Sequence, residues 1–572
     1  MYSRAGTNSN FMTQNPINNK TWFWLFFSLL VAYIFGLFVP LMNEDASHHA
    51  NIALHMVQNH DYVNLVDDMG KDYLDKPHLH FWLTALSFNL FGVNTIAYKI
   101  PAFLVTILGL FSTFRLGKIL YNRNAGLMAA VIYASAQAQF LANNDVRMDA
   151  LLTASIIFAT WQLVESAMST ARWYNYVLAA LGLAMAFTTK GMIGFVMPCA
   201  ALFFWLLYQR NWGKMFNWRW LLVFVLWLVF IAPCVYCYYL QYDLHPEKVV
   251  RGMTNVSGVK FIMWQQNFER LEGKHWGKGH KDYFFFFHTL LWAFLPFCLL
   301  TYIAFFDKMA FFFKSRFANL KNQELLTAGT IVIIFAIISS SGYQLPHYLN
   351  ILFPFFALIT AGVLWAKFEQ HKEKVLSIYL KVQYLVIAIV AVLLVLLNFW
   401  CFPVHSWAVI GVSLIVLAAM IYVFVKERGL LTRLVVLSVL MASLTNVLLN
   451  GNVYQQLLNY QGGIGLAQVV NRNHIPKDRI FNLDFHSSGF NFYTQHLTGF
   501  TSIDEIRAKR TKGEPVWIYT TAGTKQLMEK AGLQFEVVYS DTDFGVTRLT
   551  KEFLNPATRK QACSTDYLLK IR

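Results

Sequence analysis

The run WFWLFFSLLVAYIFGLFVP at residues 22–40 carries no charged side chain. As a helix, it is long enough to cross the ~30 Å hydrocarbon core of a lipid bilayer. Similar apolar runs follow it along most of the chain. Backbone polar groups in lipid must be hydrogen-bonded within the protein, so repeated runs of this length predict helices rather than strands. The sequence therefore predicts an α-helical polytopic membrane protein.

The composition agrees with this fold class. Hydrophobic residues make up 56% of the chain and charged residues 14%, whereas soluble domains carry about 25% charged residues. The formal net charge is +16, but most of the excess Lys and Arg lies in short loops between apolar runs. That distribution is typical of membrane topology. It argues against a nucleic-acid partner, because proteins that bind nucleic acids carry their basic residues as a patch on a folded domain.

The first run also decides between an anchor and a cleaved leader. It is longer than the core of a signal peptide, and no small-x-small cleavage site follows it, so we expect it to remain as an anchor. The chain has six cysteines. Cys234 and Cys237 have Cys-x-x-Cys spacing but lie inside an apolar run. We interpret them as small membrane residues rather than a redox or zinc pair.

The distribution of Lys and Arg predicts the topology, because cytoplasmic loops are enriched in these residues. With the N-terminal tail inside, alternation of about thirteen transmembrane helices places the basic connectors inside as well. The predicted helices are 21–41, 98–118, 125–142, 148–168, 174–189, 192–208, 219–240, 283–304, 325–341, 346–366, 378–400, 405–425 and 430–449. The basic connectors are Arg115–Arg123, Arg210–Arg219, Lys308–Lys321, Lys367–Lys374 and Lys426–Arg433.

The short apolar stretch 78–92 allows two interpretations. If it spans the membrane, the basic segment 115–123 falls outside, against the positive-inside rule. If it lies along the membrane, that segment falls inside with the other basic connectors. We therefore predict a juxtamembrane helix.

After about residue 450 the long apolar runs give way to shorter patterns. Arg479–Leu483 and Val516–Tyr519 have strand patterns, and Thr524–Ala531 has a helical one. Together they indicate a small α/β domain. We predict three parts: a cytoplasmic tail (1–20), a transmembrane domain (21–450) with outer loops 43–97 and 241–282, and an extracytoplasmic α/β domain (451–572).

The predicted topology gathers ionisable residues from distant parts of the sequence on the outer face. Ionisable groups at membrane depth are costly and are candidates for function. Such a cluster suits an active site or the vestibule of a channel. Its members are Glu44, Asp45, Asp75, Lys76, Asp145, Arg147, Asp149 and Lys190, together with the loop 241–282 and the segment Tyr343–Tyr348.

Asp45 follows the first helix in the polar cluster Glu44-Asp-Ala-Ser-His-His49. One interpretation is an interfacial helix cap. The other is a general base, or a carboxylate that orients an acceptor. Adjacent histidines on a helix point in different directions, so His48 and His49 are weak candidates for a chelating pair.

Asp145 and Asp149 would share one face if their segment is helical. The alternative is an Arg–Asp surface pair of little energetic weight. Lys76, Lys190 and Arg270 are natural counter-ions for an anionic substrate, and each has a snorkelling side chain as its alternative.

Lys190 lies in Thr188-Thr-Lys-Gly-Met-Ile-Gly194, whose glycines allow a ligand to approach the backbone closely. Three histidines, His275, His280 and His288, lie in or near the outer loop. Each is an interfacial side chain or a ligand, and His280 is the best ligand candidate of the three.

At these positions the sequence resembles the GT-C glycosyltransferases that use a polyprenyl-phosphate sugar as donor. The most similar branches are the lipid A aminoarabinose transferases and the protein mannosyltransferase relatives. The resemblance covers roughly residues 20–365, and the motifs occur in the order that the family has them. They are Asp45-Ala-Ser-His-His-Ala-Asn-Ile-Ala53, Asp75-Lys-Pro-His-Leu-His-Phe-Trp-Leu83, Asp149, Thr189-Lys-Gly191, Arg270 with His280, and Leu345-Pro-His-Tyr348.

The resemblance implies an inverting transfer by single displacement, in which an acceptor attacks the anomeric carbon and polyprenyl phosphate leaves. Asp45 would orient or deprotonate the acceptor hydroxyl, with Asp149 in support. Charge on the leaving phosphate would be stabilised electrostatically by Lys76, Lys190, Arg270 and Tyr348. No cofactor is required, although a divalent metal held by Asp75 and His280 is an alternative.

The same resemblance implies a bacterial inner-membrane enzyme with its active site and C-terminal domain in the periplasm. The acceptor would be a lipid, such as lipid A, or a protein hydroxyl, with membrane lipids around the chain. The sequence departs from the family at His48-His49, where the family often has Arg-Tyr. It also departs at His78, in place of a second Pro, and at Tyr343 or Gln344, in place of Lys. These departures leave the exact donor open.

Two other function classes remain. A transporter or channel for an anionic or lipid-linked solute predicts broken helices or paired repeats at the membrane midplane. A non-catalytic scaffold that presents the C-terminal domain gives no reason for lysines and carboxylates to gather on the outer face. Sequence patterns therefore favour the transferase.

Overall fold

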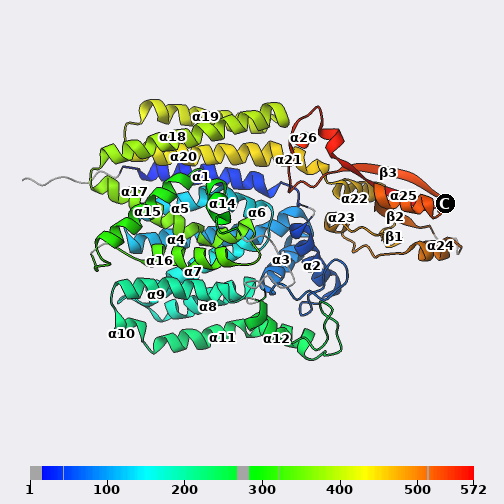
Figure 1. The fold of residues 1–572 in the computed structure, drawn as a ribbon, viewed down its shortest axis with the longest axis horizontal. Helices are drawn as coiled ribbons and strands as arrows, with labels where there is room; N and C mark the ends of the chain where they lie inside the picture. Colours follow the sequence, from blue (N-terminus) through cyan, green and yellow to red (C-terminus); the bar gives the residue numbers. More distant parts are fainter. Residues whose placement is uncertain are drawn as a thin grey trace, which may run out of the picture.

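The computed structural model describes residues 16–42, 44–266, 269, 282–320, 323–511 and 515–571. A long bundle of helices makes up most of the molecule, and a small domain with a β-sheet lies at one end of it (Figure 1). The predicted fold class, helical and polytopic with a C-terminal α/β domain, is confirmed.

Each predicted membrane segment is largely helical, but 125–142 is divided between two helices, α5 and α6, and 283–304 is divided between α14 and α15. The bundle helices are α1 (Asn19–Leu37), α4 (Thr95–Leu120), α5 (Arg123–Ser135), α6 (Gln137–Asn144), α7 (Asp149–Ser166), α8 (Trp173–Lys190), α9 (Ile193–Tyr208), α11 (Arg219–Tyr238), α14 (Phe285–Ala293), α15 (Cys298–Lys314), α16 (Leu326–Ser340), α17 (Phe353–Glu369), α18 (Glu373–Val395), α19 (Trp407–Lys426) and α20 (Leu430–Leu448).

Length and hydropathy alone identify 7 of the described helical segments as able to cross a membrane, or up to 8 if the bent pair α5 and α6 is one span. The bend of 56° lies at Ala136, whose extended backbone interrupts the helix. The helices α3, α9 and α16 are apolar but shorter. The chain is therefore a multi-pass membrane protein, and the number thirteen stays a prediction.

Small residues bring the central helices into close contact. A Cβ added to Gly182 in α8 would lie 2.8 Å from the Cα of Ala159 in α7, and one added to Gly109 in α4 would lie 2.9 Å from the Cβ of Ala154. Lipid tails are as apolar as the helices, so close packing of backbones is a main source of attraction between helices in a membrane. Helix α7 is buried along almost its whole length. It forms the centre of the bundle.

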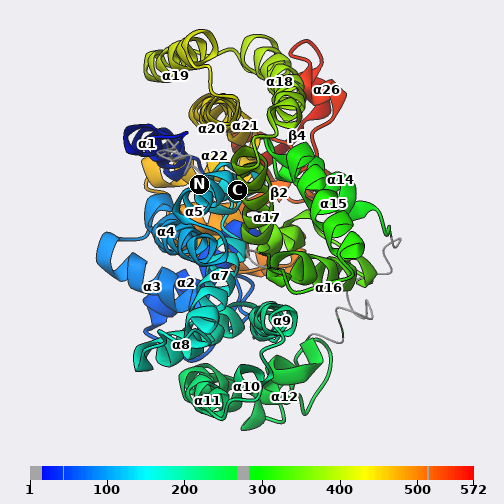
Figure 2. The same cartoon turned by 90° about the vertical axis from the view of Figure 1, so that its left-hand side faces the viewer.

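The outer helices show the opposite pattern. Within α19 only Val409 and Val416 are buried. Helices α18 and α19 lie at one edge of the bundle and α11 lies at the opposite edge (Figure 2). Apolar side chains cover these exposed faces, as expected of surfaces in contact with lipid.

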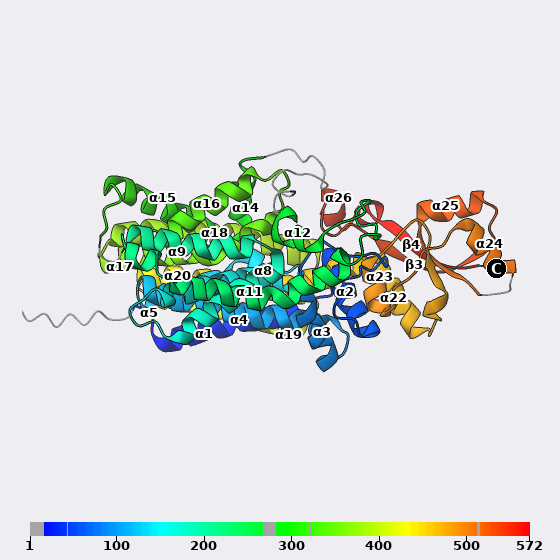
Figure 3. The same cartoon turned by 90° about the horizontal axis from the view of Figure 1, so that it is seen from below.

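The two ends of the bundle differ. The short helix α10 (Trp212–Met215), in one of the basic connectors, lies at the end far from the sheet (Figure 1). The helices α2 (Asp45–Asn59) and α3 (Leu79–Phe91) lie at the other end, next to the C-terminal domain (Figures 1 and 3). The predicted helix in 78–92 is therefore present as α3, and it is too short to be a full membrane span. The loop beyond α11 adds the short helix α12 (Gly258–Lys260).

The C-terminal domain contains one four-stranded sheet in the order β1-β2-β4-β3. Its strands are β1 (Ile480–Asn482), β2 (Trp517–Thr521), β3 (Phe535–Asp543) and β4 (Ser564–Ile571). Strands β1 and β2 are parallel, and the other pairs are antiparallel. Its helices are α22 (Gly462–Arg472), α23 (Ser488–Thr494), α24 (Ile503–Thr511), α25 (Ala522–Lys530) and α26 (Lys551–Leu554).

The strand and helix patterns recognised in the sequence correspond to β1, β2 and α25. The sheet packs on α22 and α23 through Leu466, Phe490 and Leu568. The helix α20 continues through α21 (Tyr454–Leu457) to Tyr460 before the domain begins to fold. The predicted boundary at 450 falls inside this continuous helical run.

Candidate active site

Asp149 and Lys190 form a buried ion pair at one end of the bundle. Asp149 is the first residue of α7 and Lys190 is the last residue of α8. The Lys190 Nζ donates a hydrogen bond of 2.7 Å to the Asp149 Oδ1. Their side chains are only 8% and 3% exposed. An acidic residue is favourable at a helix N-terminus and a basic one at a C-terminus, so both positions suit their charges.

The turn before α17 brings a third motif to this pair. Residues Pro346–Leu352 form a 3-10 helix, and Pro is suited to such a first helical position because it has no N–H to satisfy. The Lys190 Nζ lies 5.1 Å from the centre of the Tyr348 ring. The His347 Nε2 lies 4.0 Å from the Asp149 Oδ2. Three segments predicted to converge on the outer face therefore meet here.

A second charged group surrounds Arg147. Its Nη1 lies 3.2 Å from the Asp45 Oδ2, and its Nε donates a 2.5 Å hydrogen bond to Asp145. Burial raises the pKa of the Asp145 carboxyl, and the guanidinium of Arg147 partly offsets this effect. Arg147 therefore links the carboxylate at the start of α2 with the loop that leads into α7.

The backbone at Met148 separates the two aspartates of this loop. The helix begins only at Asp149, so Asp145 and Asp149 do not share a helix face. Met148 has φ of 76°, in the left-handed region that non-glycine residues seldom adopt. Its side chain is fully buried in an apolar cluster with Ile52, Phe81 and others. That packing holds a strained backbone in place, and it directs Arg147 toward Asp45 and Asp149 toward Lys190.

The side chain of Asp45 is 56% exposed at the first position of α2. Its neighbours His48 and His49 point apart, as expected. The His48 Nδ1 lies 2.9 Å from the Asp68 Oδ1, whereas the His49 Nε2 lies 3.3 Å from the Tyr73 hydroxyl. Burial lowers the pKa of His49 well below its ordinary value. The two histidines are not a chelating pair.

Asp75 pairs with Arg251, and the Nη1 of Arg251 also lies 3.0 Å from the Oε2 of Glu269. Lys76, the next residue, lies within electrostatic reach of His49 and His347. Lys76 therefore lies near the candidate site, and the carboxylate of Asp75 forms an ion pair with Arg251.

This pairing bears on the metal hypothesis. His280, the other proposed metal ligand, and Arg270 lie outside the described residues, as does His275. Among the residues that the structure describes, no three His, Cys, Asp or Glu side chains are grouped to hold a metal ion. The Asp75 carboxylate is paired with Arg251. A metal held by Asp75 and His280 stays a prediction, and we derive no step through one.

Other residues that the sequence singled out have structural roles. His288 is exposed at the start of α14 and lies 3.0 Å from Asp282, consistent with an interfacial side chain. Cys234 and Cys237 are free thiols. Cys234 packs 3.7 Å from the His78 Nδ1. They therefore form neither a disulfide nor, with the described residues, a metal site.

A cavity of about 320 Å³ opens beside the ion pair. Asp149, Lys190 and Tyr348 line its polar end, and Ser341 also contributes. The remaining walls are apolar, and they come from the start of α9, the end of α16 and the segment before residue 265: Met192, Ile193, Val196, Met263, Trp264, Ile337, Ile338 and Ile351, with Leu152 of α7. Such a site suits an amphiphile with an anionic head and an apolar tail.

Comparison with known proteins agrees with these features. Residues 75–237 match the family model of dolichyl-phosphate-mannose-protein mannosyltransferases. The undecaprenyl phosphate-alpha-4-amino-4-deoxy-L-arabinose arabinosyl transferase of Pseudomonas aeruginosa strain UCBPP-PA14 is 26% identical over 280 residues, which are 47% of this chain and 48% of that protein. A Pseudomonas fluorescens Pf0-1 transferase of the same name is 23% identical over 288 residues, 48% of each chain. The chain thus matches about half the length of these curated relatives.

Solved structures extend the likeness to the whole chain. The crystal structure of ArnT from Cupriavidus metallidurans bound to undecaprenyl phosphate has a TM-score of 0.74 at 17% identity, with 97% of this chain and 98% of that chain covered. The chain has the GT-C fold. The apo structure of the same transferase gives a TM-score of 0.72 over 96% of this chain. The resemblance that the ordered motifs indicated is therefore confirmed at the level of the fold.

Within this GT-C fold, the motif residues Asp149, Lys190 and Tyr348 meet at one cavity. Asp45 is joined to this group by its ion pair with Arg147, which precedes Asp149 by two residues. Sequence reasoning counted Arg147 among the outer charges but gave it no role, and it missed His347 entirely. The available signal for His347 was its place inside the Leu345-Pro-His-Tyr348 motif, one residue before Tyr348.

Proposed function

We propose that this protein is an inverting glycosyltransferase that moves a sugar from a polyprenyl-phosphate donor to a hydroxyl of a lipid, such as lipid A, or of a protein. The observation that carries the proposal is the Asp149–Lys190 pair at the polar end of an otherwise apolar cavity. The solved relative of the same fold is bound to undecaprenyl phosphate, and the names of the curated relatives specify an undecaprenyl-phosphate sugar.

The cavity suits the two halves of such a donor. The prenyl chain lies along the apolar walls from α9 and α16, and the phosphate lies at Lys190 and Tyr348. Lys190 then shares its charge between Asp149 and the phosphate. As the glycosidic bond breaks, negative charge grows on the phosphate, and a fixed cation in a site with little water stabilises that charge more than it stabilises the ground state.

Asp45 acts on the acceptor. Its carboxylate is exposed, and Arg147 holds it at 3.2 Å, so it is oriented before an acceptor arrives. Asp45 accepts the proton of the attacking hydroxyl. Phosphate is already a good leaving group, so the reaction needs no strong acid. Attack from the side opposite to the phosphate inverts the anomeric centre.

The proposal includes a location. Basic connectors occur at the far end of the bundle, and such connectors favour the cytoplasm. The candidate site and the C-terminal domain then face away from the cytoplasm. In a bacterial inner membrane, that side is the periplasm. The same reasoning assigns 1–20 to the cytoplasm, 21–450 to the membrane domain and 451–572 to the periplasm.

The direct test is transfer of a radiolabelled sugar from a polyprenyl-phosphate donor by purified protein in detergent, with lipid A and hydroxyl-containing peptides as acceptors. Wild type is compared with Asp45→Asn and with the double variant Asp149→Asn, Lys190→Met, which leaves no uncompensated buried charge at the pair. We expect transfer by wild type and a loss of at least about a hundredfold in kcat in both variants, while both stay monodisperse. The labelled product identifies the acceptor class.

A matched control is Lys314→Ala, which removes a lysine at the end of α15 that lines a different cavity, with Tyr121 and Asp307. It should transfer sugar as wild type does. If monodisperse wild type transfers nothing from a broad panel of donors, the transferase proposal is wrong. Flux assays in liposomes would then test the transporter alternative.

A further inference from the structure

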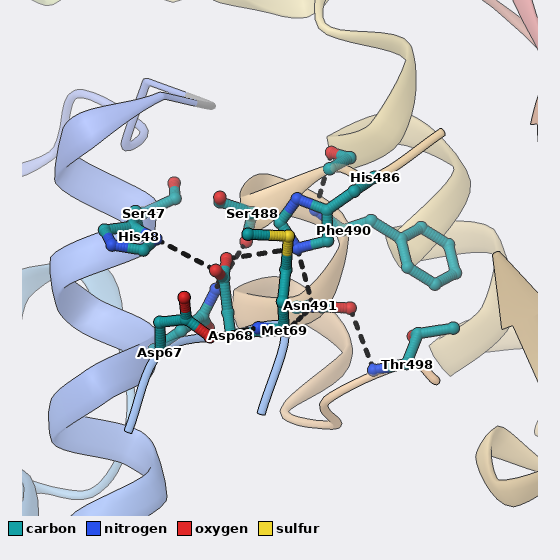
Figure 4. Close-up of polar contacts among 12 residues, drawn as sticks. Ser47, His48, Asp67, Asp68, Met69, His486, Ser488, Phe490, Asn491 and Thr498 are labelled. Carbon is teal, nitrogen blue, oxygen red and sulfur yellow. Dashed lines mark hydrogen bonds and ion pairs between the residues drawn. The ribbon is translucent and has the colours of Figure 1, made fainter. Parts of the chain in front are cut away.

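A buried carboxylate joins the C-terminal domain to α2. The Asp68 side chain, in the loop between α2 and α3, is 0% exposed. Its Oδ1 lies 2.9 Å from the His48 Nδ1, and its Oδ2 lies 3.3 Å from the Nε2 of His486. Figure 4 shows Asp68 between these two histidines, which come from opposite sides of the domain boundary.

Amide groups complete this contact. The Asn51 Nδ2 lies 3.2 Å from the Asp68 Oδ2 and donates a 2.9 Å hydrogen bond to the Ser488 carbonyl. The Asn491 Nδ2 donates to the Asp68 carbonyl at 3.3 Å. The start of α23 is therefore bound to α2 and its following loop by a connected set of hydrogen bonds (Figure 4).

The charges in this cluster are matched. Burial alone would raise the pKa of Asp68, but hydrogen bonds and positive charge from His48 and His486 hold it far below its ordinary value. Burial alone would lower the pKa of His48, but Asp68 with help from Asp67 and Asp45 raises it. A buried carboxylate without such partners is strongly unfavourable, so removing one histidine weakens the whole contact.

The helix held by this contact carries Asp45. His48 follows Asp45 by three residues, so both lie near one face of the first turn of α2. A helix is stiff over one turn, and a shift of His48 therefore moves Asp45. Arg147 fixes the carboxylate of Asp45 from the side of the bundle, whereas Asp68 and His486 fix its helix from the side of the C-terminal domain.

We propose that Asp68 and His486 are positioning residues, through which the C-terminal domain holds α2 and keeps Asp45 in place for the acceptor. This inference rests on the proposed glycosyl transfer and assigns a task to the C-terminal domain. The geometry requires no contact of either residue with substrate. A displacement of about 1 Å at a reacting group can reduce a rate by as much as a hundredfold.

Two variants of His486 separate its hydrogen bond from its bulk. Its ring stacks on Phe500 with 6.1 Å between ring centres. His486→Phe keeps an aromatic ring there but removes the donor to Asp68. His486→Gln keeps a side-chain N–H donor. The matched control is Gln495→Ala in the same domain, whose side chain donates to the Val93 carbonyl at 3.1 Å rather than to the Asp68 cluster.

The first measurement is hydrogen–deuterium exchange over residues 45–59 in the full-length protein in detergent, which needs no activity. We expect exchange in the first turns of α2 to rise about tenfold in His486→Phe and to stay near wild type in His486→Gln and Gln495→Ala. Unchanged exchange in His486→Phe would overturn the inference whatever the enzyme assay gives.

The second measurement is sugar transfer by the same proteins. His486→Phe should lower kcat by about ten- to a hundredfold and leave KM for the donor within about twofold, because the donor cavity is not touched. His486→Gln should recover most of the rate. Raised exchange with an unchanged kcat would overturn the positioning role. If wild type transfers nothing, the proposed function fails, and the exchange result still decides whether His486 holds α2.

Discussion

The Asp149–Lys190 pair shows how a buried charge depends on its partner. Both side chains are almost fully buried, with 2.7 Å between Nζ and Oδ1. Removing one member leaves the other as an uncompensated charge, whereas removing both leaves no such charge. The His347 Nε2 lies 4.0 Å from the Asp149 Oδ2, which is too far for a hydrogen bond, so it does not replace Lys190.

This gives a prediction at the residue scale. Lys190→Met should lower the free energy of unfolding by about 3–5 kcal/mol, because Asp149 stays charged and buried. The double variant Asp149→Asn with Lys190→Met should regain most of that stability but transfer no sugar. Thermal unfolding in detergent measures the stability of both variants, and the sugar-transfer assay measures the activity of the double variant. A single variant as stable as wild type would show that water or another cation reaches Asp149.

At the scale of elements, the close packing of α7 and α8 decides where this pair forms. A Cβ on Gly182 would lie within 2.9 Å of the backbone nitrogen of Ala159, closer than side-chain atoms are found. The two helices must therefore separate if Gly182 is replaced. Because Asp149 and Lys190 lie at adjacent ends of these helices, separation pulls the pair apart.

We predict that Gly182→Ala lowers the free energy of unfolding by about 1–3 kcal/mol through this overpacking, and lowers kcat for sugar transfer as well. The matched control is Gly411→Ala in α19, where an added Cβ meets no atom within 4 Å. It should be neutral or stabilising by up to about 1 kcal/mol, because Ala is the better helix former. Thermal unfolding of both variants tests the contrast. Equal effects would contradict it.

At the scale of the whole molecule, the contact between the C-terminal domain and α2 should depend on pH. The pKa of His48 is raised above 6.5, so its pairing with Asp68 is fully present below that value and is lost as the pH rises through the raised pKa. The pKa of Asp68 is lowered below 3.8, so its contribution is present above that value and is lost only at much lower pH. Asp45, Asp67 and the ring of Tyr73 also face His48.

We therefore expect α2 to be held most firmly at Asp68, the residue that joins it to the C-terminal domain, between about pH 4 and 6.5, and we expect this hold on α2 to loosen as the pH rises beyond that window. Hydrogen–deuterium exchange of α2, corrected for the intrinsic pH dependence of exchange, should show lower protection at pH 8.5 than at pH 6. Asp68→Asn should flatten this dependence. A wild-type profile that is equally flat would count against the charged contact.

Orientation is the second prediction at this scale. Alkaline phosphatase, which is active only outside the cytoplasm, should be active when fused after Ile571 and inactive when fused in the connector at Glu427. The physical reason is that basic connectors stay on the cytoplasmic side, and Figure 1 places the sheet domain at the end opposite to α10. The reverse pattern of activity would invert the proposed topology.

The sequence by itself determined the membrane class, the helical segments, the juxtamembrane helix and the strands β1 and β2. These properties follow from the length of local apolar runs, from the positions of Lys and Arg and from local periodicity, which need no knowledge of distant contacts. It also placed Asp45, Asp149, Lys190 and Tyr348 on the same face, because helix alternation alone sends successive loops to opposite sides of a membrane.

Only the tertiary structure decided which of these charges meet. The pairing of Asp149 with Lys190 depends on Gly182 packing against Ala159, the separation of Asp145 from Asp149 depends on the left-handed backbone at Met148, and Asp75 turned out to face Arg251. The contact of Asp68 with His486 joins residues more than 400 positions apart. Such pairings are set by steric fit and the cost of burying unpaired charge, which exist only once the chain has folded.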